Sequence, residues 1–227
     1  MYTLAQLKLA CQHAAGGIAT PASGSSWEDV VKDSIRHITC MHAWTWRERL
    51  MLLDLAADQE VVDLPDNFGQ LVSLARTDKI TACRRVSLSR INELRSYPIA
   101  IEVGVMLYCV TGDNVPYTLE IYPTPTATVT GALRGVYLRG PEYPATDSDT
   151  VSMPESFGTA LKALCRAWAK GEELDSDGTD ATKFRDCITA AIAEESGIEN
   201  DLGMMDNTLA SPALPVQWLR PSHINVT

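Results

Sequence analysis

The sequence lacks the patterns that most directly identify a function. No apolar run approaches the ~20 residues that cross a bilayer, so we expect no membrane span and no membrane partner. The chain has 19 basic against 29 acidic residues, and its net charge of −10 argues against general nucleic-acid binding. Phosphate-binding glycine loops and the HExxH and GxSxG motifs of hydrolytic enzymes are missing. The N-terminus, MYTLAQLKLACQHAAGG, is a poor secretion signal.

Paired metal ligands are also missing. No two of the six cysteines form a CxxC pair, and the four histidines are scattered. Since zinc sites need ligands at short spacing, we predict no metal and no cofactor. Most cysteines lie in apolar stretches, which favours buried free thiols in a chain that folds in a reducing cytoplasm. These cysteines are Cys11, Cys40, Cys83, Cys109, Cys165 and Cys187.

What the sequence does contain is enough for one domain of 227 residues with an ordinary globular balance, 45% hydrophobic and 21% charged. Apolar residues recur at helical spacing in four segments, which predicts helices over 3–15, 27–42, 155–171 and 179–196. Gly16 with Gly17, Gly171 and Gly197 are expected to end three of them. We expect Ser25 or Ser26 to cap the second helix, and Asp180 or Thr179 to cap the last.

Strands are predicted between the second and third of these helices, from 44 to 139. The segments 44–64, 70–76 and 99–139 are rich in β-branched and aromatic residues and are interrupted by turn formers. Gly112, Asp113 and Asn114 form a hairpin-turn signal. A short helix is expected over 88–95. The pattern indicates an α+β fold, in which a helix bundle accompanies an antiparallel β-sheet region.

After Gly197 the periodicity ends, although the chain stays apolar. We therefore interpret 1–198 as the folded domain and 199–227 as an extended C-terminal arm. The arm is too apolar for a solvated tail, so we expect it to lie on its own domain or on a neighbour. Its candidate contact residues are Met204, Met205, Leu214, Val216, Trp218 and Leu219.

Two charged clusters leave alternatives open. Asp175, Asp177 and Asp180 lie in a loop whose spacing approaches a calcium loop without its closing glutamate, so a solvated loop with a helix cap is the simpler interpretation. A small hydrolase that uses this loop is the enzymatic alternative. Arginines form the second set, either pairing with acidic patches of a neighbouring subunit or facing solvent: Arg84, Arg85, Arg90, Arg95, Arg134 and Arg139.

Three segments together resemble the head–tail connector, or portal adaptor, proteins of tailed bacteriophages. The first is HAWTWRERLMLLDL followed by VVDLPDNFGQLVSL, the second is YTLEIYPTPTATVTGALRGVYLRGPEYPATDSDTVSMPESF, and the third is the helix pair 155–171 and 179–196 with the apolar tail behind it. The resemblance covers roughly residues 25–200. The long segment before Trp27 and the length of 77–97 depart from the pattern of the family.

The resemblance implies a structural virion protein without catalytic residues. Such proteins assemble in the host cytoplasm as a ring, usually a dodecamer, in the neck between head and tail. The ring would join the portal protein to a tail nozzle or tube protein, complete the head after packaging, and let genome DNA pass through its lumen without specific binding. The arm would reach the portal or an adjacent subunit, whereas the turn at Gly112, Asp113 and Asn114 and the 140–150 loop are candidates for the tail-side contact.

Charge is compatible with this interpretation. Twelve copies of a chain with net charge −10 would carry about −120, and an acidic lumen would repel DNA phosphates and let the duplex slide. Another neck or tail-completion protein is the nearest alternative, and ring symmetry separates the two.

Overall fold

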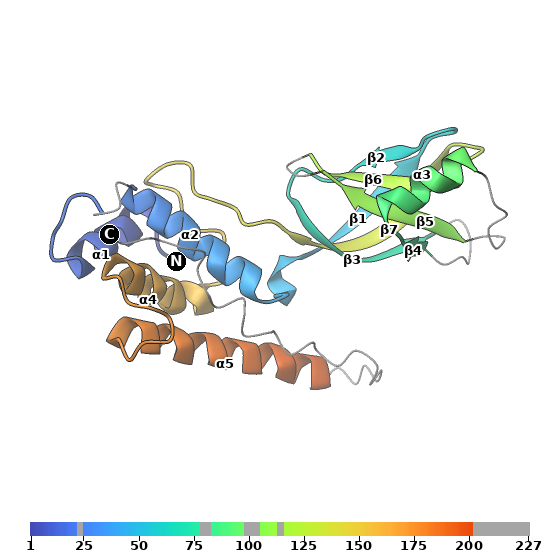
Figure 1. The fold of residues 1–227 in the computed structure, drawn as a ribbon. Helices are drawn as coiled ribbons and strands as arrows, with labels where there is room; N and C mark the ends of the chain where they lie inside the picture. The colour runs from blue at the N-terminus through green and yellow to red at the C-terminus, as the bar shows by residue number, and fades with distance from the viewer. Residues whose placement is uncertain (22–24, 78–82, 98–104, 113–115, 202–227) are drawn as a thin grey trace. The chain divides into compact units, whose positions relative to one another are not determined.

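The computed structural model describes residues 1–21, 25–77, 83–97, 105–112 and 116–201. The chain forms two compact units, Met1–His42 with Tyr143–Thr227, and Ala43–Glu142. Helices make up the described part of the first unit, and strands dominate the second (Figure 1). The predicted α+β class is therefore confirmed.

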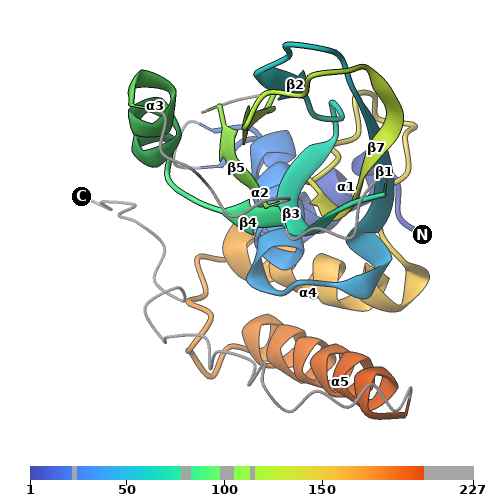
Figure 2. The same cartoon turned by 90° about the vertical axis from the view of Figure 1, so that its right-hand side faces the viewer.

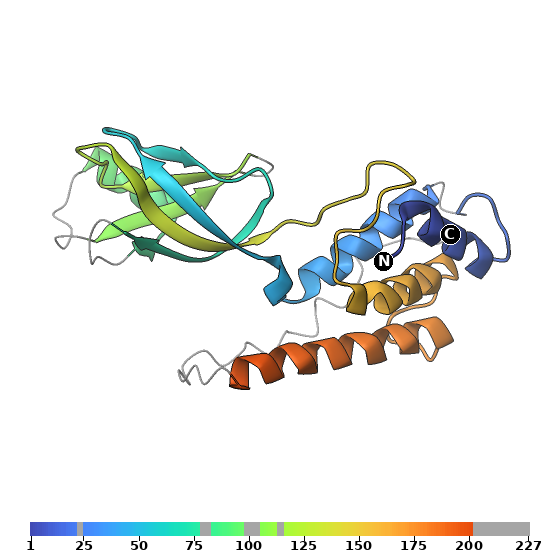
Figure 3. The same ribbon diagram turned by 180° about the vertical axis from the view of Figure 1, so that it is seen from behind.

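The helical unit is organised around one central helix. α4 packs against all three of the other α-helices in this unit (Figures 2 and 3). It can do so because most of its circumference is small or apolar, with Leu161, Leu164 and Cys165 fully buried. The unit consists of α1 (Leu4–Ala14), α2 (Trp27–Met41), a short 3₁₀ turn η2 (Glu155–Phe157), α4 (Gly158–Ala169) and α5 (Thr179–Asp201).

Local sequence explains where the first two helices begin. Thr3 and Gln6 form a capping box at α1, in which each side chain accepts a hydrogen bond from the other residue's backbone N–H. Ser26 and Asp29 do the same at α2, so Ser26 is the cap of the two serines that the sequence offered. α1 ends as predicted at a glycine with positive φ, 76° at Gly16.

The last helix departs from expectation at both ends. It continues through Gly197 to Asp201, because one glycine inside a helix costs only about 1 kcal/mol and helix-forming residues flank it. At its start, the Glu172 carboxylate accepts the Ala181 amide at 3.0 Å, whereas Asp180 is held by Lys170 and Arg166. The predicted cap at Asp180 or Thr179 is thus replaced by a carboxylate from the preceding loop.

The second unit contains two sheets. The first has three antiparallel strands in the order β1-β7-β3, and the second has four in the order β2-β6-β5-β4. The short helix α3 (Leu88–Ser96), capped by Ser87, contacts β5 and β6. The other elements are η1 (Thr45–Arg47), β1 (Glu48–Leu55), β2 (Val61–Asp63), β3 (Phe68–Arg76), β4 (Cys83–Arg85), β5 (Met106–Thr111), β6 (Thr118–Tyr122) and β7 (Val129–Arg139).

One hydrophobic core joins the two sheets. On β5 and β6 alternate residues point into it, as expected when one sheet face is buried. The three-stranded sheet contributes Met51, Leu55, Phe68, Leu74, Ala132, Leu133 and Tyr137, and the four-stranded sheet contributes Val62, Met106, Tyr108, Leu119 and Ile121. Every member of this cluster lies within Ala43–Glu142, so the unit has its own core.

One strand pairing departs from the antiparallel expectation. β4 pairs with β5 in parallel, with Cys83 opposite Met106 and Arg85 opposite Tyr108. A three-residue strand that carries two arginines has no alternating apolar pattern, which is why the sequence did not predict it. The segment 98–104, expected to begin the following strand, lies outside the described residues.

The cysteines are free, as predicted, but not uniformly buried. Cys11 and Cys165 are fully buried between α1 and α4, where the Cys11 thiol donates to the Cys165 carbonyl at 3.6 Å. Cys40 is exposed, which corrects the prediction for that residue. It follows the buried Ile38 and Thr39 on α2, and helical rotation turns it away from the face that they occupy.

Candidate interaction surfaces

Most of the predicted interface residues fall outside the described part of the chain. These are the arm residues Met204, Met205, Leu214, Val216, Trp218 and Leu219 and the turn residues Asp113 and Asn114. Gly112 is described and follows β5 with a φ of 114°, a conformation that favours glycine. The hydroxyls of Thr111 and Thr118 lie 2.8 Å apart and close the β5–β6 hairpin. The hairpin therefore forms where the turn signal predicts it.

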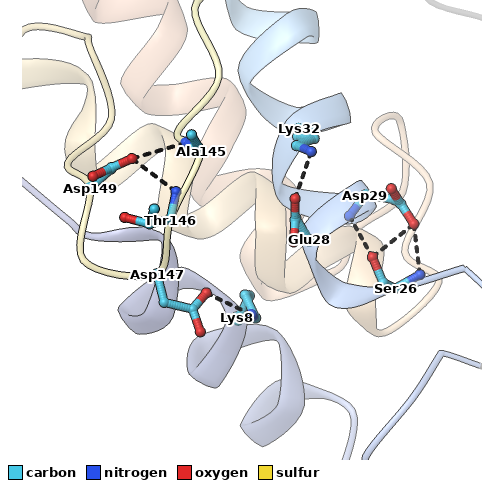
Figure 4. A network of polar contacts seen from close by, with 9 residues as sticks. All are labelled: Lys8, Ser26, Glu28, Asp29, Lys32, Ala145, Thr146, Asp147 and Asp149. Carbon is cyan, nitrogen blue, oxygen red and sulfur yellow. Dashed lines mark hydrogen bonds and ion pairs between the residues drawn. The ribbon is translucent and has the colours of Figure 1, made fainter.

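The loop after β7, considered for tail contact, is tied to the start of α1. Its Asp147 and Asp149 carbonyls accept the Ala5 and Leu4 amides, each at 3.1 Å. The Asp149 carboxylate accepts the amides of its own turn, at Ala145 and Thr146, and these bonds lower its pKa (Figure 4). Asp147 also pairs with Lys8 at 2.7 Å. This segment thus supplies the partners that the first amides of α1 would otherwise lack.

The acidic loop 172–180 contributes to an ion-pair cluster between α4 and α5. The buried Asp180 carboxylate contacts both Lys170 and Arg166, the latter at 3.2 Å. Burial alone would raise the pKa of Asp180, but the two cations outweigh it and hold the pKa below its usual value. Asp175 and Asp177 are exposed on the same loop. The contacts of Asp180 support packing of α5 on α4.

A shallow hollow of about 160 Å³ lies beside this cluster. Lys162, Arg166 and Lys183 line it together with Asp180 and Tyr2, and the Lys162 ammonium lies 5.1 Å from the centre of the Tyr2 ring. The lining is therefore more basic than the chain as a whole.

Several of the arginines singled out in the sequence form ion pairs within the sheet unit. Arg95, on α3, contacts Glu120 at 2.9 Å and Glu60 at 3.4 Å and so ties the helix to β6. Arg139 pairs with Glu142 at 3.0 Å. These contacts favour an internal role for part of the arginine set. Arg134 is exposed on β7.

The outer face of the three-stranded sheet carries exposed apolar side chains that sequence reasoning did not single out. Leu50 and Leu52 on β1 are 55% and 61% exposed, and Val72 on β3 is 51% exposed. Val136, half-buried on β7, is directly opposite Leu50. The signal was present in the uninterrupted run of apolar residues 50–53, because a strand with one solvated face would alternate with polar residues.

Within the described ranges, no helix combines the length and apolar character that crossing a membrane requires. The same residues bring together no group of three or more histidine, cysteine, aspartate or glutamate side chains suited to a metal ion.

Comparison with protein families gives one match of nearly full length. The family model described as SU10 adaptor protein matches residues 2–212, which include both structural units. A search of curated proteins finds no match.

Proposed function

Because the chain belongs to the SU10 adaptor protein family, a family of phage structural adaptors, we propose that it forms the ring that joins the portal to the tail in the virion neck. The observation that carries this proposal is the match over residues 2–212, which spans the helical unit, the sheet unit and the beginning of the arm. Members of such a family are virion components and not typically enzymes. The ring completes the head after packaging and gives DNA a channel.

The arm, residues 199–227, makes the assembly contacts in this proposal. Its apolar residues from Met204 to Leu219 would be buried on the portal or on an adjacent subunit. α5 ends at Asp201, and the six candidate contact residues all follow it in the sequence. The β5–β6 turn at Gly112, Asp113 and Asn114 is the proposed contact with the tail nozzle or tube.

Charge supports a passive channel. The chain has a net charge of −10, and a ring of such chains would repel the phosphate backbone more than it attracts it. A DNA duplex whose phosphates contact few lysine or arginine side chains is bound weakly and can slide through the ring.

The first test is the mass of the purified protein in solution, alone and mixed with its portal protein. We expect a defined ring when the portal is present. Deleting residues 202–227 should leave a folded protein that no longer joins the portal, because the deletion begins beyond the last residue of α5. Circular dichroism checks the fold, and mass photometry or ultracentrifugation measures the assembly.

A shorter deletion provides the matched control. Removing 221–227 retains all six candidate contact residues of the arm and should leave portal binding intact. A 202–227 deletion that still assembles on the portal would contradict the role given to the arm. A small oligomer that ignores the portal, or a symmetry unlike that of the portal in a reconstructed particle, would instead indicate another neck component.

A further inference from the structure

Within the described part of the chain, β1 presents a free backbone edge. It lies at the end of the three-stranded sheet, and among the described residues only β7 pairs with it. Among the same described residues, backbone hydrogen bonds outside the sheet ladders involve none of the residues 48–55. A strand edge of this kind is a ready template for a further strand, which proteins usually protect with lysine, proline, bulges or a covering element.

The middle of β1 has little of that protection. Glu48 with Arg49 and Asp54 lie towards its two ends, whereas residues 50–53 carry no charge. Leu50 and Leu52 point away from the core and are more than half exposed, while Met51 between them is 4% exposed. The free edge therefore adjoins an apolar surface, which favours a partner strand with apolar side chains on one face.

The C-terminal arm contains a segment with matching chemistry. Residues 207–219 include no charged side chain, in a chain that is 21% charged. Within it, Leu214, Val216 and Trp218 alternate with Pro215 and Gln217, which is the spacing of one face of a strand. In that register the residues 214, 216 and 218 can all turn their backbone groups to β1. Pro215, which has no N–H, then faces the other side.

We infer that residues 213–219 of one copy add as a strand to the free edge of β1 in the next copy of the ring, with Pro212, which lacks an N–H, just before the strand. Leu214, Val216 and Trp218 would then cover Leu50 and Leu52. Main-chain hydrogen bonds to β1 supply affinity and the alternate side chains supply specificity. This inference rests on the proposed ring and chooses the neighbouring subunit as the receptor of the arm.

Exchange between copies follows from length and symmetry. The 11 residues that link Asp201 to residue 213 span up to about 40 Å when extended, so the strand segment can lie well away from the end of α5 and contact an adjacent subunit. Each copy offers one arm and one β1 edge, so the contact is head-to-tail. When successive copies are related by a rotation that closes on itself, such contacts produce a ring in which the β1 edge of every copy is covered.

The first experiment weakens the receptor surface in the full-length protein. The double variant Leu50→Glu with Leu52→Glu should keep its fold, because both side chains are exposed, but it should need at least about tenfold more protein to assemble. The matched control is Leu9→Glu with Ile18→Glu, which changes residues of 50% and 56% exposure in the helical unit by the same charge. It should assemble like the parent. Equal assembly by the receptor variant would overturn the inference.

The second experiment locates the arm directly. A photoreactive benzoylphenylalanine replaces Trp218 in full-length protein, and isotope-labelled and unlabelled chains are mixed, assembled with the portal and irradiated. We expect cross-links from position 218 to residues 48–55 of the other isotopic form. The same group at Gln217, on the opposite face of the added strand, should give few cross-links to Leu50 and Leu52.

Each remaining outcome contradicts the inference. Cross-links to β1 within the same chain would exclude exchange between copies. Cross-links to the portal alone would overturn the strand-addition contact and leave the adaptor role intact. Loss of the ring in both glutamate double variants would mean that added negative charge, not the β1 edge, controls assembly.

Discussion

Among individual residues, His37 is expected to make the stability of the helical unit depend on pH. Its ring lies on α2, 5.5 Å from the Trp168 ring on α4 and 6.0 Å from the Phe184 ring on α5. The buried Nε2 atom has no hydrogen-bond partner among the described residues. Burial lowers the pKa of His37 below its ordinary value of 6.5, because these surroundings penalise the charged ring.

The pH dependence of stability follows from that direction. As the pH falls below about 6.5, the unfolded chain takes up a proton at His37 that the folded chain resists, so free energy of unfolding is lost. We predict that the protein melts at a lower temperature at pH 5.0 than at pH 7.5. In a His37→Phe variant this difference should shrink, by roughly 2–4 °C for each 1 kcal/mol of unfolding free energy that protonation of His37 removes. Calorimetry at both pH values measures it.

The control for this prediction is internal. His13, His42 and His223 remain in both proteins, so the difference between their pH profiles isolates His37. Identical profiles would show that the ring is protonated as easily in the folded chain as in the unfolded one.

Residue roles within the acidic loop show a limit of sequence reasoning. The sequence indicated a cap near Thr179 and Asp180, but the cap comes from Glu172 and the buried partner of the cations is Asp180. Both are carboxylates near the same helix start. Only the position of Arg166 on α4 and of Lys170 at its C-cap decides which one is buried, and this is a tertiary contact that local spacing does not contain.

At the scale of secondary structure, the backbone of β3 at Gly69 passes very close to the backbone at the end of β7. A methyl group at Gly69 would lie 2.9 Å from both the Gly140 nitrogen and the Leu138 oxygen, which are backbone atoms that cannot turn aside. Gly69→Ala should therefore destabilise the sheet by about 1–3 kcal/mol. Chemical denaturation of the full-length protein measures the change.

Gly140→Ala is the matched control, because the nearest atom to its added methyl group is the Phe68 oxygen at 3.7 Å, an ordinary contact. It should be neutral or slightly stabilising. Equal losses of stability in both variants would mean that the β3–β7 approach is not the constraint.

Elements with strong periodicity were predictable and short or tertiary ones were not. The predicted strand segment 99–139 and its turn signal at Gly112 agree with the β5–β6 hairpin, and capping residues placed α2 at Trp27–Met41. β4 was missed because three residues hold too little pattern and its parallel partner is β5, more than 20 residues away. The exposed Leu50 and Leu52 were missed as a surface, because the apolar run 50–53 is equally compatible with a strand that its own chain covers on both faces.

At the scale of the whole molecule, the sheet unit contains a hydrophobic core of its own. All members of the sheet-unit core come from Ala43–Glu142, so this segment has its own source of stability. We predict that residues 43–142 expressed alone unfold in a single cooperative thermal transition. Leu133→Ala, which removes a fully buried side chain, should weaken it by about 2–5 kcal/mol, whereas Leu50→Ala should change it little.

Near-ultraviolet circular dichroism and calorimetry of the 43–142 segment check this prediction. A segment that melts without cooperativity would show that the sheet unit needs the helices in order to fold.

The first and last strands of the sheet unit bring its two chain ends close together. The chain passes into it after His42 and out of it before Tyr143, and close to these joints Glu48 pairs directly with Leu138. The sheet unit is inserted between His42 and Tyr143 of the helical unit. Because its two ends are close together, the helical unit has no longer loop to close when the sheet unit is present, and the entropic cost of loop closure stays small. In evolutionary terms, we expect a β module with such ends to be exchangeable as one piece. Recombination at these two joints would give a phage lineage a new β module while the helical scaffold keeps its reading frame.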